Sequence, residues 1–286
     1  MDLQAIRKQL TPSAAEMNAV AQATKEIISG LEGAGREVVA GGSTSKGTNL
    51  AGNFDVDIFV RFKDGGALDD KLEALVKKLN LDYERIHGSR DYFTFTYKGF
   101  FFEIVPVKYV TRAEDADNVT DMSPLHVFWA KEKLSENLRS DIRLAKQFCK
   151  ASGTYGAESY INGLSGHVLD ILLIHYESFE NFLKAASQWE GKTIIDPENK
   201  HDNALANLNE AKTHSPLIVI DPVDPSRNAA AALGEEKYDT FIDVAKHYLK
   251  EPTEAYFTIT RVTPELLRKH KSGDDALYML EVEPLE

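Results

Sequence analysis

The chain has 286 residues, of which 43% are hydrophobic, and a formal net charge of −12 at pH 7. This length accommodates one large domain or two ordinary ones with sizeable cores. The acidic balance argues against indiscriminate nucleic-acid binding, because phosphate contacts need clustered lysine and arginine; only a restricted basic patch is compatible with it. A single cysteine excludes an internal disulfide, and the eight histidines show no zinc-ligand spacing.

No apolar run reaches the roughly 18 residues that mark a candidate membrane span. The first ten residues, MDLQAIRKQL, also lack the apolar stretch of a secretory signal. We therefore expect a soluble cytoplasmic protein without a membrane partner.

The first 122 residues are predicted to alternate helices with strands. Cap and turn residues mark a helix that starts after Ser13 and ends near Gly33. Hydrophobic periodicity then predicts, in chain order, strands over 36–40 and 54–62, a helix over 68–79, and a hairpin of strands over 92–97 and 100–109.

After about residue 123 the pattern becomes mainly helical. Helical patterns cover 123–130, 135–151, 165–187 and 235–249, and short extended segments are predicted at 193–195, 217–220, 254–260 and 276–283. The expected class is α+β: a mixed β-sheet with helices, followed by a mainly helical part. The expected boundaries divide the chain into 1–122, 123–257 and 258–286.

A glycine-rich segment, Gly41-Gly42-Ser43-Thr44-Ser45-Lys46-Gly47-Thr48, lies between the first two predicted strands. Glycines allow backbone N–H groups to approach an anion, while Ser43 offers a hydroxyl and Lys46 a point charge. An ordinary turn is the alternative. Two carboxylates follow within about ten residues, and this spacing favours phosphate binding over the ordinary turn.

Those carboxylates, Asp55 and Asp57, share one face of the predicted strand because residues i and i+2 of a strand point the same way. Like charges side by side in an apolar run repel each other unless a cation lies between them. A third acid, Glu103, lies in the apolar second strand of the hairpin, where a metal shared with the other two is one candidate partner. Carboxylate oxygens suit magnesium, so the pattern predicts a metal-triphosphate site for nucleotidyl transfer.

These residues resemble the nucleotidyltransferase superfamily built on the polymerase-β-type head. More narrowly, the chain resembles the archaeal-type (class I) CCA-adding tRNA nucleotidyltransferases. The narrower resemblance rests on Ser123-Pro124-Leu125-His126, on 144–148 around Lys146, on 153–158 around Tyr155 with 162–166, and on 221–228 around Arg227. It implies a catalytic head over 1–122, a helical central (neck) domain over 123–257 and a short remnant of a body domain over 258–286.

The resemblance also implies a role for each matching position. Asp55, Asp57 and Glu103 would be the catalytic carboxylates that bind two Mg²⁺ ions. The nucleotide-binding residues would be Gly42, Ser43, Lys46, His126, Lys146, Tyr155 and Arg227. The implied reaction transfers nucleotides from CTP and ATP to the 3′-end of tRNA, as CCA addition or repair with release of pyrophosphate and without a nucleic-acid template.

The chain departs from the family at a few points. The family usually has arginine where Lys46 stands and aspartate where Glu103 stands; lysine keeps the charge but loses bidentate geometry. The family also continues well beyond this length into domains that grip tRNA, so a shortened member is expected, and whether it forms a homodimer is left open. The alternative is a related template-independent nucleotidyltransferase that makes oligonucleotides or cyclic dinucleotides, or that acts on another RNA.

Several of these residues also fit structural roles when taken alone. A lone His126 fits a helix end or the surface, and a lone Tyr155 fits packing. Basic residues recur at three- or four-residue spacing on the predicted helix over 135–151, at Arg139, Arg143, Lys146 and Lys150. Such a stripe suits a triphosphate, an RNA backbone or simple solvation, and the sequence leaves these three open.

Overall fold

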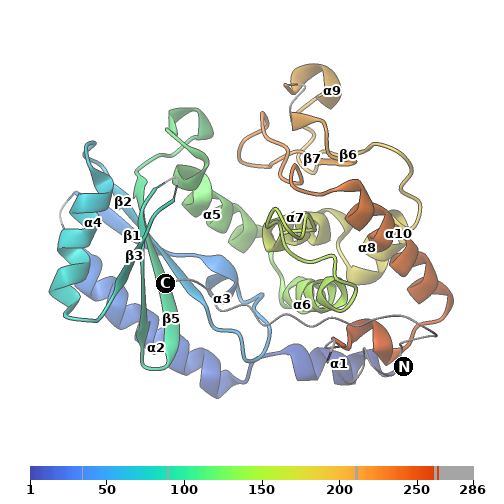
Figure 1. Cartoon of the computed structure of the whole chain (residues 1–286), viewed down its shortest axis with the longest axis horizontal. Helices are drawn as coiled ribbons and strands as arrows, with labels where there is room; N and C mark the ends of the chain where they lie inside the picture. The colour runs from blue at the N-terminus through green and yellow to red at the C-terminus, as the bar shows by residue number, and fades with distance from the viewer. Residues whose placement is uncertain (34, 89, 210–211, 261–262, 264–286) are drawn as a thin grey trace, which may run out of the picture.

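The computed structural model describes residues 1–33, 35–88, 90–209, 212–260 and 263. A mixed sheet with its helices forms one half of the molecule, and a mainly helical part forms the other (Figure 1). The predicted α+β class is confirmed. The segment predicted as a strand over 276–283, and most of 258–286, lie outside the described residues. No described helix combines the length and apolar character needed to cross a membrane.

The sheet has five strands in the order β1-β2-β5-β4-β3. Their bounds are β1 (Arg36–Ala40), β2 (Val56–Phe62), β3 (Glu84–Ile86), β4 (Tyr92–Tyr97) and β5 (Phe100–Lys108). Strands β2 and β5 are parallel, whereas the other neighbours are antiparallel, and β4 and β5 form the predicted hairpin. The register pairs Asp57 of β2 with Glu103 of β5, so the two acids project from the same face of the sheet.

The two faces of the sheet differ in character. One face is apolar and packs against α2 (Ala14–Leu31) and α4 (Leu68–Val76); its strand residues are Val56, Ile58, Val60, Phe62, Phe93, Phe95, Phe102 and Ile104. Because side chains alternate along a strand, the odd-numbered residues of β2 face the other way. On that other face, Phe59 packs with Val127 of α5 (Ser123–Lys133). The face that carries the acids therefore meets the helical half.

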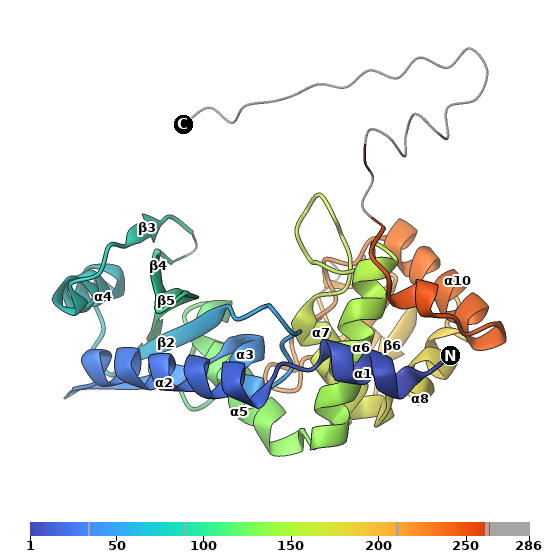
Figure 2. The ribbon, with the colours of Figure 1, turned by 90° about the horizontal axis from the view of Figure 1, so that it is seen from below.

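The helical half is built around aromatic side chains, among them Phe148, Phe179 and Phe241. Its elements are α1 (Leu3–Leu10), α6 (Glu136–Ala151), α7 (Gly166–Tyr176), α8 (Phe179–Ala186), α10 (Glu235–Lys250) and the 3₁₀ turn η5 (Glu254–Phe257). Strands β6 (Thr193–Ile195) and β7 (Leu217–Val219) form a parallel pair near α9 (Ala204–Asn207). Helix α1 packs on α6, while the next helix, α2, runs along the sheet (Figure 2).

Three segments differ from their predictions. The pattern over 165–187 is not one helix but two, α7 and α8, because Glu177 takes a positive φ of 64° and Ser178 caps α8 by accepting the Asn181 N–H. The almost wholly apolar α7 shows no periodic break, so its end is not visible in the sequence. The segment over 254–260, predicted to be extended, contains η5 instead. The glycine-rich segment also forms a short helix, α3 (Gly42–Lys46).

Candidate functional site

The three predicted metal ligands lie near the start of β2 and on the adjoining β5. Asp57 and Glu103 are direct neighbours across the two strands, and Asp55 precedes β2. Burial, with the negative charges of Asp57 and Asp55, raises the pKa of Glu103 to about 7. Burial also raises the pKa of Asp57, against the opposing effect of Lys46. These three carboxylates fit a divalent cation, because a positive ion between them would offset the repulsion among their negative charges.

Helix α3 is held tightly against the acids. The Gly41 N–H donates to the Asp57 carbonyl at 2.7 Å, and the Thr44 hydroxyl donates to the Asp55 carbonyl at 2.7 Å. Gly42 has a φ of 64°, and a Cβ there would lie 1.6 Å from Asp57 Oδ2. Only glycine fits this contact without moving the carboxylate.

The basic stripe of α6 binds the chain that follows α3. Its hydrogen bonds run from Arg139 Nε to the Lys46 carbonyl (2.9 Å), from Arg143 to the Gly47 (2.6 Å) and Asn49 (3.1 Å) carbonyls, and from Lys146 Nζ to the Thr48 carbonyl (3.0 Å). Arg143 and Lys146 are buried, so the interpretation of these two residues as part of a solvated helix face is wrong. Burial lowers the pKa of Lys146 to about 8, against the charge of Asp170. Arg139, Arg143 and Lys146 thus hold the backbone of residues 46–49 in place.

A buried ion pair connects α3 to α7. Lys46 pairs with Asp170, which is fully buried, and Lys146 adds a second positive charge nearby. Burial opposes ionisation of Asp170, yet these two cations lower its pKa. Burial and the charge of Asp170 raise the pKa of Tyr155 to about 12, and the Lys150 ammonium lies 5.2 Å from the Tyr155 ring centroid. The sequence reasoning missed Asp170, since nothing local marks an acid in an apolar helix as the partner of a distant lysine.

A cavity of about 340 Å³ lies where the two halves meet. Its lining includes the predicted residues Gly42, Lys46, Asp57, His126 and Arg227. Among the residues that the structure describes, Asp55, Glu103, Ser43, Lys146 and Tyr155 are not part of this lining. The folded chain thus brings residues from β2, α3, α5 and the 221–228 motif to one cavity.

Two groups at this cavity had no assigned role in the sequence. His167 of α7 lines it, and Asp221 of the 221–228 motif lies fully buried beside it. His126 Nε2 lies 2.8 Å from Asp221 Oδ1, and Arg227 donates to Asp221 Oδ2 at 2.7 Å. Although burial opposes ionisation of Asp221, the hydrogen bond with His126 and the nearby His167 hold its pKa below the usual range. Asp221 could have been found as a member of the recognised motif, whereas His167 carries no local signal.

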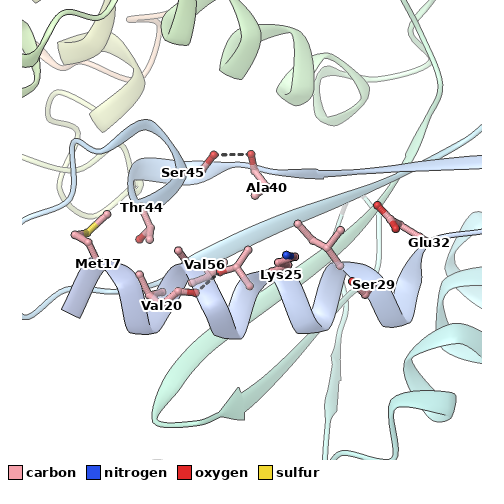
Figure 3. A pocket seen from close by; sticks show the side chains of 12 residues that line it. Met17, Val20, Lys25, Ser29, Glu32, Ala40, Thr44, Ser45 and Val56 are labelled. Atoms are coloured by element: carbon pink, nitrogen blue, oxygen red, sulfur yellow. Dashed lines mark hydrogen bonds between the residues drawn. The ribbon is translucent and has the colours of Figure 1, made fainter. Parts of the chain in front are cut away.

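A larger cavity, of about 540 Å³, lies between α2 and the segment formed by β1 and α3 (Figure 3). Met17, Val20 and Lys25 line it from α2, and Val56 lines it from β2. Val56 belongs to the apolar face of the sheet, opposite to the face that carries Asp57. This cavity therefore does not include the acids, and we place the candidate site at the smaller one.

Two family models match the chain. Residues 21–109 match the model described as a nucleotidyltransferase domain, and residues 140–258 match the model described as the second domain of tRNA nucleotidyltransferase. The CCA-adding enzyme of Nanoarchaeum equitans is 42% identical over 219 residues, which are 74% of this chain and 55% of that protein. The CCA-adding enzyme of Halobacterium salinarum is 31% identical over 281 residues, 94% of this chain and 60% of that protein. The chain thus spans little more than half the length of these relatives.

Solved structures share the fold. The Cid1 poly(U) polymerase superposes with a TM-score of 0.71 at 12% identity, covering 90% of this chain and 97% of that one. CdnC of E. coli MS115-1 superposes with a TM-score of 0.62 at 17% identity, covering 88% and 92%. At these identities the likeness concerns the fold alone, a polymerase-β-type nucleotidyltransferase fold. With the family models and the archaeal relatives, it follows that the chain belongs to the archaeal-type (class I) CCA-adding tRNA nucleotidyltransferase family.

Proposed function

We propose that this protein transfers nucleotides from CTP and ATP to the 3′-end of tRNA without a template, adding or repairing CCA and releasing pyrophosphate. The observation that supports this most is the pairing of Asp57 with Glu103 beside a cavity lined by Lys46, His126 and Arg227. The acids suit divalent cations, and the basic groups that line the cavity suit a triphosphate. The archaeal relatives, named as CCA-adding enzymes, support tRNA as the primer.

The acids Asp55, Asp57 and Glu103 would hold the metal. The superfamily generally uses divalent ions, and we propose two Mg²⁺ ions here. When bound, they would supply Lewis-acid activation of the primer's 3′-hydroxyl and charge neutralisation at the leaving pyrophosphate. The raised pKa of Glu103 supports this assignment, because it reports a carboxylate that lacks a nearby compensating charge.

The remaining residues would bind and orient the nucleotide. Ser43 and the Gly42 backbone would contact the triphosphate with Lys46, and His126 would approach it from the neck. Arg227 would present hydrogen-bond donors to the incoming base. Lys146 would act through the loop that follows α3, where it donates to the Thr48 carbonyl, and Tyr155 would support the triphosphate from the neck. In this arrangement the nucleotide lies between a head over 1–122 and a neck over 123–257.

The test uses labelled CTP and ATP with Mg²⁺ and four RNA conditions: tRNA lacking CCA, intact tRNA, an unrelated RNA, and no RNA. We expect C, C and A to be added only to tRNA that lacks them. Extension of the unrelated RNA would contradict tRNA specificity. Products formed without RNA would instead support an oligonucleotide or cyclic-dinucleotide synthase. Light scattering with and without tRNA answers the open question of a homodimer.

The metal assignment has its own test. Asp55→Ala and Asp57→Ala should each lower incorporation by about a thousandfold or more while the protein stays folded by circular dichroism, because the metal would lose a ligand. Asp64→Ala removes an exposed acid at the other end of β2 and is the matched control. Near-normal incorporation by either site variant would show that these acids do not bind the catalytic metal.

A further inference from the structure

One buried carboxylate connects two groups that the proposed function assigns to different parts of the nucleotide. His126 belongs to α5 and is proposed to contact the triphosphate, whereas Arg227 belongs to the 221–228 motif and is proposed to face the base. Both contact the side chain of Asp221. We propose that Asp221 is a positioning residue that orients His126 and Arg227 together, so that triphosphate binding and base selection depend on the same carboxylate. This inference rests on the proposed function.

The two oxygens of Asp221 have separate tasks. Oδ1 accepts the backbone N–H groups of Val223 (2.9 Å) and Asp224 (3.2 Å), which fixes the turn of the motif. Oδ2 accepts the Arg227 Nη1–H at 2.7 Å. His126 Nε2 lies between them, 2.8 Å from Oδ1 and 2.9 Å from Oδ2. One neutral oxygen would be enough to accept the two backbone N–H groups of the turn. The second oxygen is therefore available to the side chains of Arg227 and His126, which line the cavity.

Charge and burial make these contacts strongly directional. The Asp221 side chain is completely buried, with 0% of its surface accessible to water. Its negative charge must therefore be compensated by the hydrogen-bond donors around it. Hydrogen bonds in which both partners are charged are short and geometrically strict. Arg227 uses one of its five N–H groups on Asp221, which restrains the plane of the guanidinium while its side chain remains 32% exposed at the cavity.

His167 extends the same arrangement from α7. Its ring lies edge-on to that of His126, with 4.5 Å between ring centroids, and its Nε2 lies 3.5 Å from Asp221 Oδ2. One potential ligand atom from each of His126, His167 and Asp221 lies within 4.8 Å of the other two, a spacing that a metal ion could also use. Arg227 argues against a metal there, because its guanidinium already lies 2.7 Å from the same carboxylate and would repel a cation.

The first test replaces Asp221 by asparagine. The asparagine oxygen still accepts the Val223 and Asp224 N–H groups, but its amide nitrogen cannot accept from Arg227. We expect KM for ATP and for CTP to rise about tenfold or more, with a smaller fall in kcat, and discrimination against GTP and UTP to weaken. Asp224→Asn is the matched control: it removes the same charge from the same turn, where the carboxylate accepts from the backbone N–H and the hydroxyl of Ser226, and should leave both quantities unchanged.

A double-mutant cycle separates positioning from a general structural role. If Asp221 acts partly through Arg227, Asp221→Asn should raise the dissociation constant for Mg-ATP by a smaller factor in an Arg227→Ala background than in the wild type, because only the part that acts through His126 remains. If the full effect persists in that background, the proposal is overturned. A second cycle needs no change at Asp221: His126→Gln and Arg227→Lys should have non-additive effects on binding, because both side chains share one carboxylate. Additive effects there would also overturn it.

Binding is measured by calorimetry with Mg-ATP and Mg-CTP in the absence of RNA, so this inference and the proposed function fail separately. A protein that extends no tRNA but binds nucleotides in an Asp221-dependent way would contradict the function alone. A protein that extends tRNA with unchanged KM and selectivity after Asp221→Asn would contradict the inference alone. Stoichiometric zinc in the purified protein that is lost in Asp221→Asn would likewise overturn it in favour of a metal site.

Discussion

Replacing Glu103 by glutamine should stabilise the metal-free protein above pH 7 while weakening its response to Mg²⁺. The pKa of Glu103 is raised in the folded chain, first by burial and then by Asp57 and Asp55. An acid whose folded pKa lies above its unfolded value makes the fold less stable as pH rises from the unfolded value through the folded one. Below that window both states are protonated and the cost is absent. Glutamine keeps the shape of the side chain and never carries the charge.

The size of the effect follows from the same pKa. The change from 4.5 to about 7 corresponds to about 3 kcal/mol at about 1.4 kcal/mol per unit. Because the side chain is only half-buried, water screens part of the repulsion, and we expect Glu103→Gln to gain about 1–3 kcal/mol at pH 8. The gain should shrink to well under 1 kcal/mol near pH 4.5, where little of the charge remains.

The assay is urea unfolding in EDTA at pH 4.5 and pH 8, repeated at pH 8 with Mg²⁺. Magnesium should raise the stability of the wild type more than that of Glu103→Gln, since a ligand stabilises the state that binds it. Glu84→Gln is the matched control: Glu84 is exposed and lies on the same cross-strand row, two strands away through Thr94. Equal stability of wild type and Glu103→Gln at pH 8, or an equal gain at both pH values, would refute the idea that the three acids repel one another.

Two further changes test how the site is held. Gly42→Ala should displace Asp57 and lower activity by about a hundredfold, because its Cβ would lie 1.6 Å from Oδ2, whereas Gly65→Ala meets nothing within 4 Å and should be neutral in the same nucleotide-incorporation assay. Lys46→Met should destabilise the fold by about 3 kcal/mol in urea, because it removes a partner of the buried Asp170. Lys184→Met breaks an exposed ion pair on α8 and should change less than about 0.5 kcal/mol; equal losses for the two lysines would contradict this reasoning.

Local patterns in the sequence were enough for most elements, and they singled out the three acids that we propose as metal ligands. Strand alternation predicted that Asp55 and Asp57 share one side, although β2 begins only at Val56, and turn residues marked the hairpin that carries Glu103. These inferences depend on neighbours one to four positions away, where side-chain direction follows from backbone period alone. The same reasoning did not show α3, β3 or the break at Glu177, because short helices, short strands and positive φ values depend on contacts with the rest of the fold.

The partners of the site residues were decided by tertiary structure. Pairing of Asp57 with Glu103 requires a parallel register between strands that are far apart in sequence. The ion pair of Lys46 with Asp170 spans 124 positions, and the contact of His126 with Asp221 spans 95. A sequence names the charged groups but not the distances between them, and buried charges are stabilised only by partners at contact distance. For this protein, the sequence alone therefore named the charged groups proposed for the chemistry, while the packing of α7, α5 and the 221–228 motif decided which side chains contact them.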